Sequence, residues 1–207
     1  MKVLVIDYHM GNLASVARAL EECGAEATVS RRPADLENFS RFVLPGVGAF
    51  GDAMTNLREL GWVEKIHGAL EQPGVAMLGI CLGMQLLATK GFEGGENTGL
   101  GVIPGTVKRL EADTAATRIP HVGWNEVNAL PSDPLFREIP PGTDFYFVHS
   151  YHFAPDDAAH VIARTDYSGG FASAVRRGNV FGVQFHPEKS SRPGFQLLRN
   201  FLSPQLS

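Results

Sequence analysis

The amino-acid sequence predicts an α/β fold, with a mostly parallel central sheet flanked by helices and an antiparallel extension in the second half. Strand and helix patterns alternate through residues 3–89, which favours right-handed crossovers and a parallel sheet covered on both faces. From residue 106 onward, short strand patterns follow one another with few helical patterns between them. A length of 207 residues and a hydrophobic fraction of 44% suit one domain, so we expect a single domain over residues 1–207.

The first half contains four short apolar runs that predict buried strands. These runs cover residues 3–6, 27–29, 42–44 and 75–80, and Pro45-Gly46 is expected to end the third. Apolar residues at helical spacing predict helices between the strands. The expected helices cover residues 13–20, followed by Gly24; 52–70, with Gly61 as a candidate break; and 82–89.

The second half begins with a loop over residues 91–105, which holds six glycines. Six short strands and a closing helix are predicted after it. The strands cover residues 106–110, 125–127, 145–153, 160–165, 171–176 and 180–185, with a hairpin turn at 177–179, and the helix covers 195–202. These strands make up the antiparallel extension.

Charge and cysteine content argue against several classes of protein. The formal net charge is −4 and no basic stripe is present, which argues against nucleic-acid binding. No apolar run approaches the ~20 residues of a membrane-spanning helix, and charge arrives before a signal-peptide core forms. The two cysteines, Cys23 and Cys81, lie in unlike contexts and do not suggest a disulfide framework. We therefore expect a reduced, cytoplasmic protein without nucleic-acid or membrane partners.

The strongest local motif surrounds Cys81. It reads Gly79-Ile80-Cys81-Leu82-Gly83 between a predicted buried strand and helix, which is the nucleophile-elbow pattern with Cys in place of Ser. The tight turn presents the thiol at a helix N-terminus, where the nucleophilic thiolate is favoured, and the glycines let neighbouring backbone pass close by. The alternative is a buried structural cysteine, a description that fits Cys23 at the end of its helix.

A thiol nucleophile needs a base, and the base needs a group that orients it. His186-Pro187-Glu188 supplies both after the last predicted strand, because residues two apart in extended chain point to the same side. The other six histidines are expected to be structural, namely His9, His67, His121, His149, His152 and His160. His149 and His152 are three apart in one predicted strand and face opposite sides, so no metal pair is expected.

A glycine-rich loop, Pro45-Gly46-Val47-Gly48, follows the predicted strand beside the elbow strand. It can present backbone N–H groups to a developing oxyanion, although an ordinary turn has the same composition. A loop with two glycines can also rotate a peptide between two orientations at little steric cost. We expect such a rotation to gate hydrolysis, with a permanently formed oxyanion hole as the alternative; the sequence leaves the resting orientation open.

Together these motifs resemble the class I, or triad-type, glutamine amidotransferases. Residues 79–85 resemble the nucleophile motif of that family, and residues 183–188 resemble its His/Glu motif. Within the class, further segments resemble the glutaminase subunits of imidazole glycerol phosphate synthases. They are residues 7–13, 45–50, 120–125, 146–152 and 188–190, so the resemblance runs from about Lys2 to Phe201.

The resemblance implies an activity and a set of site residues. Cys81 would attack the side-chain amide of L-glutamine, His186 would protonate the leaving ammonia and activate water, and Glu188 would orient His186. The implied oxyanion hole is formed by the backbone of Val47, Gly48 and Leu82; Gln85 and Glu93 would hold the amino group of glutamine, and the backbone of Ser150 and Tyr151 its carboxylate. For Gln85 and Glu93 the alternative is a solvated helix end. This chemistry implies no metal and no organic cofactor.

The resemblance also implies a partner. Ammonia would pass to a cyclase subunit, expected to be a (β/α)₈ barrel, in a heterodimer that makes imidazole glycerol phosphate and aminoimidazole-carboxamide ribotide for histidine biosynthesis. Asn12, Trp124 and Lys189 lie in resembling segments and are expected at the interface with the cyclase. A core tryptophan and a solvated lysine are the alternatives for the latter two.

Other functions stay open from the sequence. One is a glutaminase subunit of anthranilate or aminodeoxychorismate synthase, although these favour a Pro-Gly-Pro loop where this chain has Pro45-Gly46-Val47. A second is a cysteine peptidase or γ-glutamyl hydrolase that acts alone. A third is a non-catalytic binding module, which the presence of Cys81, His186 and Glu188 disfavours.

Overall fold

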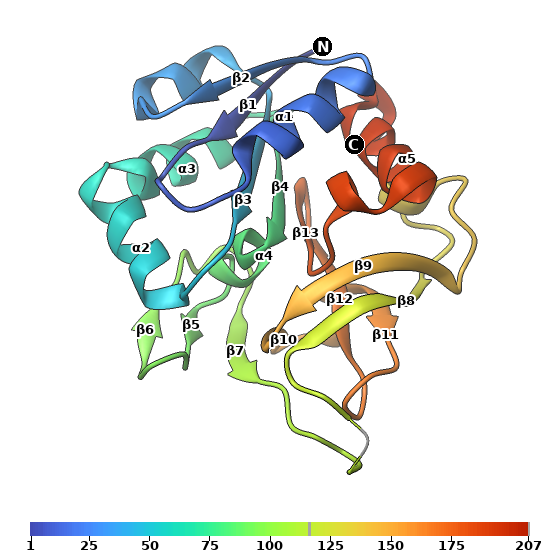
Figure 1. The fold of residues 1–207 in the computed structure, drawn as a ribbon. Coiled ribbons are helices and arrows are strands. Elements are labelled where there is room, and N and C mark those ends of the chain that lie inside the picture. Colours follow the sequence, from blue (N-terminus) through green and yellow to red (C-terminus); the bar gives the residue numbers. More distant parts are fainter. Residues whose placement is uncertain (116, 207) are drawn as a thin grey trace.

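The computed structural model describes residues 1–115 and 117–206, which are built around a nine-stranded sheet (Figure 1). In spatial order its strands are β2 (Glu26–Ser30), β1 (Lys2–Ile6), β3 (Arg41–Gly46), β4 (Ala76–Cys81), β13 (Val180–Val183), β12 (Phe171–Arg177), β11 (Val161–Thr165), β8 (His121–Ala129) and β9 (Thr143–His149). The first five strands are parallel and the last four continue the sheet with antiparallel pairing. The predicted α/β fold is confirmed.

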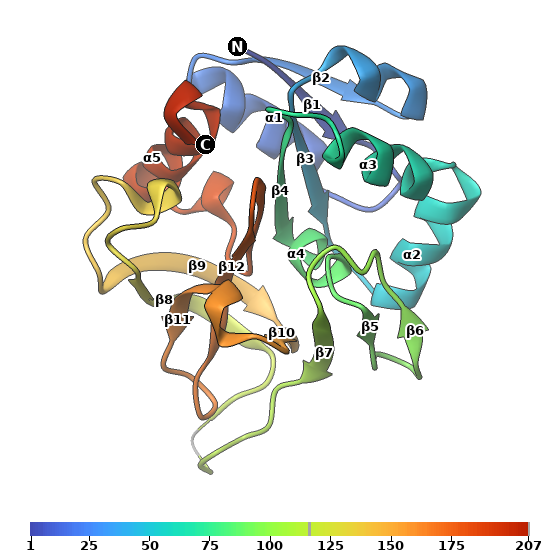
Figure 2. The same ribbon diagram turned by 180° about the vertical axis from the view of Figure 1, so that it is seen from behind.

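Helices cover both faces of the parallel strands (Figures 1 and 2). On one face lie α1 (Leu13–Glu22) and α5 (Ser191–Leu202), and on the other lie α2 (Phe50–Glu59), α3 (Trp62–Leu70) and α4 (Leu82–Leu86). The buried residues form two hydrophobic clusters, one on each face, and every residue of β3 and β4 is buried. Continuous apolar runs are what a strand buried on both faces requires. No helix within the described ranges is long and apolar enough to cross a membrane.

Several short helices connect these elements. They are the 3₁₀ helices η1 (Pro33–Asn38), η2 (Pro134–Phe136), η3 (Ala158–His160), η4 (Pro187–Lys189) and η5 (Pro204–Leu206). The helical pattern over residues 52–70 is divided at Gly61, whose φ of 76° lies in the left-handed region that glycine adopts without strain. The expected break between two helices is confirmed.

Two predicted boundaries next to the turn at Cys81 are wrong. Strand β3 continues through Pro45 and Gly46, which pair with Ile80 and Cys81. β1 pairs with β3 only at Phe42 and Val43, so Pro45 can lack an N–H on that side without leaving a partner unpaired. The helix after the elbow is also shorter than predicted, because α4 ends at Leu86 rather than at residue 89.

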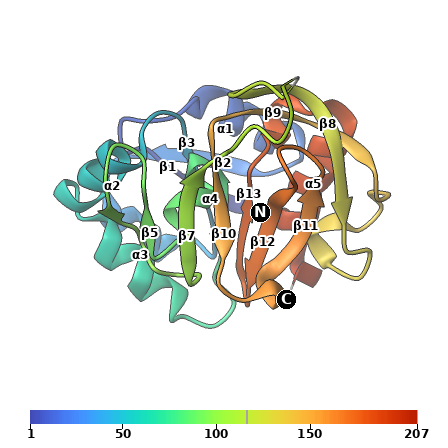
Figure 3. The same cartoon turned by 90° about the horizontal axis from the view of Figure 1, so that it is seen from below.

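The segment predicted as one strand over residues 145–153 is two strands in different sheets. β9 ends at His149 and pairs with β8, whereas β10 (Tyr151–Pro155) pairs with β7 (Gly105–Arg109). β10 and β7 form a four-stranded sheet with β5 (Lys90–Gly91) and β6 (Asn97–Thr98), below the parallel strands in Figure 1 and seen from below in Figure 3. The chain therefore changes sheets at Ser150, and this change brings residues 148–151 to the ends of β3 and β4.

Candidate active site

Cys81 occupies a sharp turn between β4 and α4. Its φ of 54° and ψ of −110° are unusual for a residue with a side chain. A Cβ added to Gly83 would lie 1.8 Å from the carbonyl oxygen of Leu44, and one added to Gly79 would lie 2.6 Å from the carbonyl oxygen of Gly83. The two glycines are therefore required by backbone that passes close to the turn, as expected for a nucleophile elbow.

His186 and Glu188 form a buried pair. The Nδ1 atom of His186 lies 2.9 Å from the Oε1 atom of Glu188, and the two side chains are only 3% and 2% exposed. The reason given for this pairing from sequence is wrong, because Pro187 begins the 3₁₀ helix η4 and Glu188 does not lie in extended chain. The turn brings the carboxylate back to the imidazole that precedes it.

The other ring nitrogen of His186, Nε2, has no hydrogen-bond partner within the described part of the chain. Burial lowers the pKa of His186, but the neighbouring Cys81 sulfur and Glu188 carboxylate outweigh it and raise that pKa to about 9. The imidazole is therefore charged near neutral pH and interacts with the sulfur of Cys81. Such a charge stabilises a thiolate.

Ser190 holds the backbone of His186 in place. Its hydroxyl donates to the carbonyl oxygen of His186 at 2.6 Å and accepts from the N–H of Tyr146 at 3.0 Å. The N–H of His186 in turn donates to the carbonyl oxygen of Tyr146 at 2.9 Å. Sequence analysis gave Ser190 no role, because its partner on β9 is far away in the chain.

One cleft of about 490 Å³ lies beside Cys81. It is lined by three separate segments, at residues 47–49, at the elbow and the chain after it, and at residues 148–151. All of the residues predicted for an oxyanion hole or for substrate line it, namely Val47, Gly48, Leu82, Gln85, Glu93, Ser150 and Tyr151. The structure thus brings together residues that the sequence related only by resemblance.

Buried glutamine side chains connect this cleft to the thiol. The amide nitrogen of Gln85 donates to the carbonyl oxygen of Tyr151 at 2.8 Å and to Oε1 of Gln184 at 3.1 Å. Gln184, which sequence analysis did not single out, donates from Nε2 to the Cys81 sulfur at 3.7 Å. Glu93 accepts from the N–H of Phe50 at 2.9 Å, at the start of α2. Gln85 is therefore not a solvated residue at a helix end.

Residues 4–204 match the family described as Glutamine amidotransferase class-I. The chain belongs to this family.

Curated relatives cover nearly the whole chain. The imidazole glycerol phosphate synthase subunit HisH of Moorella thermoacetica is 50% identical over 199 residues, covering 96% of this chain and 93% of the relative. The subunit of the same name from Nitrosococcus oceani is 46% identical over 204 residues, covering 97% and 96%. A solved structure of PurLQS from Thermotoga maritima has a TM-score of 0.77 at 22% identity, covering 97% of each chain, which shows a shared fold.

His149 lines the cleft of this amidotransferase and contacts a second histidine, His121. Nδ1 of His149 lies 2.8 Å from the carbonyl oxygen of Tyr151, and Nε2 lies 3.0 Å from Nδ1 of His121. A carbonyl oxygen only accepts, so His149 carries its proton on Nδ1 and accepts from His121 at Nε2. Burial lowers the pKa of His149 to about 3 and that of His121 to about 4, so both rings are neutral. His149 thus donates to the same Tyr151 carbonyl as Gln85, and His121 donates to His149.

Two of the predicted interface residues, Trp124 and Lys189, lie together around the ring of Tyr146. Trp124 is 53% exposed and packs edge-on against Tyr146, with ring centroids 6.0 Å apart. The Nζ atom of Lys189 lies 5.8 Å from the centroid of the same ring. Trp124 is therefore not a core residue. Asn12 is exposed at the start of α1, a helix that packs beside η4.

His149 lies on β9 and His152 lies on β10. The sequence-based argument against a metal pair assumed that both histidines lie on one strand, so that argument does not apply. Within residues 1–115 and 117–206, no group of three or more His, Cys, Asp or Glu side chains gathers as a metal site.

Proposed function

We propose that residues 1–207 form one glutaminase domain, the glutaminase subunit of an imidazole glycerol phosphate synthase. The observation that carries the proposal is that Cys81 lines a cleft and lies beside the paired His186 and Glu188 in a class I amidotransferase. The specific synthase follows from relatives that carry this name at 44–50% identity over nearly the full chain.

The reaction begins with attack of the Cys81 thiolate on the side-chain amide carbon of L-glutamine. The carbonyl π electrons move to oxygen, and the oxyanion would be stabilised by backbone N–H groups of three residues that line the cleft, Val47, Gly48 and Leu82. His186 then gives its proton to the amide nitrogen, the C–N bond breaks, and ammonia leaves behind a glutamyl thioester.

Hydrolysis of the thioester completes the cycle. His186, now neutral, takes a proton from water, and the resulting hydroxide attacks the thioester carbon. The C–S bond breaks, glutamate leaves, and the thiolate–imidazolium pair is restored. Glu188 keeps the proton of the imidazole on Nδ1 in the neutral state and stabilises the ring when it is charged, since the carboxylate lies 2.9 Å from Nδ1.

The polar residues of the cleft would hold the other end of glutamine. Gln85 and Glu93 are assigned to its amino group, and the backbone of Ser150 and Tyr151 to its carboxylate. The Tyr151 carbonyl is fixed by the Gln85 amide and by His149, so this wall of the cleft is preorganised before glutamine binds.

The ammonia would be used by a cyclase subunit that binds over the cleft. Val122, Trp124, Tyr146 and Val148 form an apolar strip on β8 and β9, and Val148 also lines the cleft. An exposed tryptophan is a typical anchor of a protein interface. Asn12 and Lys189 would join this interface. We place the heterodimer in the cytoplasm, because both cysteines are free thiols.

The loop at Gly46, Val47 and Gly48 would make hydrolysis depend on the cyclase. Glutaminase activity without an acceptor wastes glutamine, and losing one oxyanion donor lowers a rate about 10²- to 10³-fold. A ligand-bound cyclase that binds the competent loop orientation more tightly would increase its population.

The test compares glutamine hydrolysis by this chain alone, with a cyclase subunit, and with the cyclase and its nucleotide ligand. We expect low turnover alone and stimulation of about 10²-fold or more by the liganded cyclase. High turnover of the isolated chain, unchanged by both additions, would contradict the gate. Stimulation only by a chorismate-using synthase subunit would contradict the assigned synthase.

A further inference from the structure

The hydroxyl of Tyr8 is a buried polar group that the reaction described above does not use. The side chain is completely buried, and its oxygen has no hydrogen-bond partner among residues 1–115 and 117–206. Buried hydroxyls without partners are rare, and each requires an explanation. Burial and the nearby Cys81 both raise the pKa of Tyr8, so the phenol stays protonated and remains a hydrogen-bond donor.

This donor lies beside the proposed oxyanion hole. A Cβ added to Gly46 would lie 2.3 Å from the Tyr8 hydroxyl oxygen and 3.0 Å from the Cβ of Leu82. The hydroxyl is therefore at the junction of the two segments that supply oxyanion donors, the loop at Gly46 and the start of α4. It reaches that junction from the protein interior, within the hydrophobic cluster that also contains Leu82.

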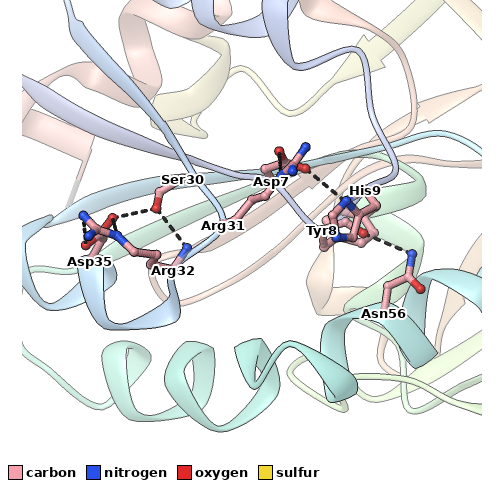
Figure 4. A network of polar contacts seen from close by, with 8 residues as sticks. All are labelled: Asp7, Tyr8, His9, Ser30, Arg31, Arg32, Asp35 and Asn56. Atoms are coloured by element: carbon pink, nitrogen blue, oxygen red, sulfur yellow. Dashed lines mark hydrogen bonds and ion pairs between the residues drawn. The ribbon is translucent and has the colours of Figure 1, made fainter.

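The backbone of Tyr8 is fixed by polar contacts on both sides (Figure 4). Asn56 donates from Nδ2 to the Tyr8 carbonyl oxygen at 3.1 Å. The preceding residue, Asp7, accepts from the N–H of His9 at 3.0 Å and from Nε of Arg31 at 2.6 Å. These contacts keep the phenol ring beside Gly46.

We propose that the Tyr8 hydroxyl is a positioning group that donates a hydrogen bond to the Gly46 carbonyl when the loop is competent for catalysis. The N–H and C=O of one peptide point in opposite directions. When the Val47 N–H faces the cleft, the Gly46 carbonyl must face the interior, where the unpaired hydroxyl lies. The competent orientation thus gives the buried hydroxyl a partner, and the unpaired hydroxyl seen here corresponds to the resting orientation. This inference rests on the proposed glutaminase function.

The test is Tyr8→Phe in the complex of this chain with its cyclase, measured with and without the cyclase ligand. We expect kcat for glutamine hydrolysis to fall about tenfold with KM unchanged, because the hydroxyl acts on the loop and not on bound glutamine. Ammonia-dependent cyclisation by the same complex stays at the wild-type rate. The melting temperature stays equal or rises, because the variant removes a buried hydroxyl without a partner.

The matched control is Thr165→Val, which also removes a fully buried hydroxyl that has no partner in the described residues, on β11. It should leave kcat unchanged. A Tyr8→Phe complex with wild-type kcat would overturn the inference, as would a fall in melting temperature with unchanged kcat. If the wild-type complex hydrolyses no glutamine, the proposed function fails instead.

A double variant tests the contact itself. Gly46→Ala should lower the melting temperature, because the new methyl group would collide with the Tyr8 oxygen. Adding Tyr8→Phe removes that oxygen and should restore part of the loss. Equal melting temperatures for Gly46→Ala and the double variant would show that the hydroxyl does not lie against Gly46 and would overturn the inference.

Discussion

Cys81 and Cys23 are the two thiols of this chain, and the backbone places them in very different surroundings. Cys23 follows the last turn of α1, half-buried, and its thiol donates to the carbonyl oxygen of Phe195 at 3.4 Å. Burial raises the pKa of Cys23, more than Arg199 lowers it, so the neutral thiol is favoured. Cys81 lies on a strained turn beside a charged imidazole and opens onto a cleft.

The difference shows how backbone geometry separates two identical side chains. Cys81, the proposed nucleophile, lies on a sharp turn between a buried strand and a helix, and two glycines allow this turn. Cys23 lies at a helix end and does not line the cleft, so its thiol has no such access to substrate.

The largest expected effect is loss of glutamine-dependent synthesis in Cys81→Ala. We expect a decrease of at least about 10³-fold in the complex with the cyclase, because the variant lacks the proposed nucleophile. Ammonia-dependent synthesis should remain near wild type. Cys23→Ala should keep glutamine-dependent activity within about twofold. Glutamine hydrolysis by Cys81→Ala near the wild-type rate would contradict the proposal that Cys81, and not Cys23, is the nucleophile.

The second prediction compares one substitution at two glycines. Gly83→Ala should lower the free energy of unfolding by about 3 kcal/mol, because the methyl group would overlap the Leu44 carbonyl. Gly68 lies on the exposed side of α3, where an added Cβ meets no described atom within 4 Å, so Gly68→Ala should stabilise by ~0.5–1 kcal/mol. Urea unfolding measures both. Similar values for the two variants would show that the elbow has room for a side chain.

The third prediction concerns pH. The pKa of His186 is about 9 in the folded protein and ~6.5 when unfolded, so the folded state binds more protons between these values. The contribution of His186 to stability is therefore complete below about pH 6.5 and is lost as pH rises through about 9.

Urea unfolding from pH 6 to 9.5, compared with His186→Gln, should show this loss as a shrinking difference between the two proteins. Both proteins should carry Cys23→Ala, because the raised pKa of Cys23 makes stability fall with rising pH in the same direction. A constant difference across this range would mean that His186 does not gain a proton-dependent partner on folding.

The sequence predicted the features that depend on local pattern. The alternation of strands and helices predicted the parallel half of the sheet, and the glycines around Cys81 predicted the turn. The family resemblance is confirmed by the match over residues 4–204. It also pointed to cleft residues on segments that only folding brings together, such as Val47 and Tyr151.

The remaining features depend on contacts between distant parts of the chain. The change of sheets at Ser150 is set by two pairing partners, β8 and β7, and no local pattern separates them. Gln184 and Tyr8 matter only because folding brings them to Cys81 and Gly46. From the sequence, Pro45 predicts the end of a strand. β3 can continue through Pro45 because β1 does not pair with β3 at this position, so the missing N–H removes no hydrogen bond to β1.

The most direct test of the central claim is to identify the thiol that reacts with a glutamine analogue carrying a chloromethyl ketone in place of the amide. We expect one label per chain, located on Cys81 by peptide mass spectrometry, and slower labelling when glutamine is in excess. Cys23 should stay unlabelled under the same conditions. Labelling of Cys23 at a comparable rate, or labelling of Cys81 that glutamine does not slow, would contradict the account.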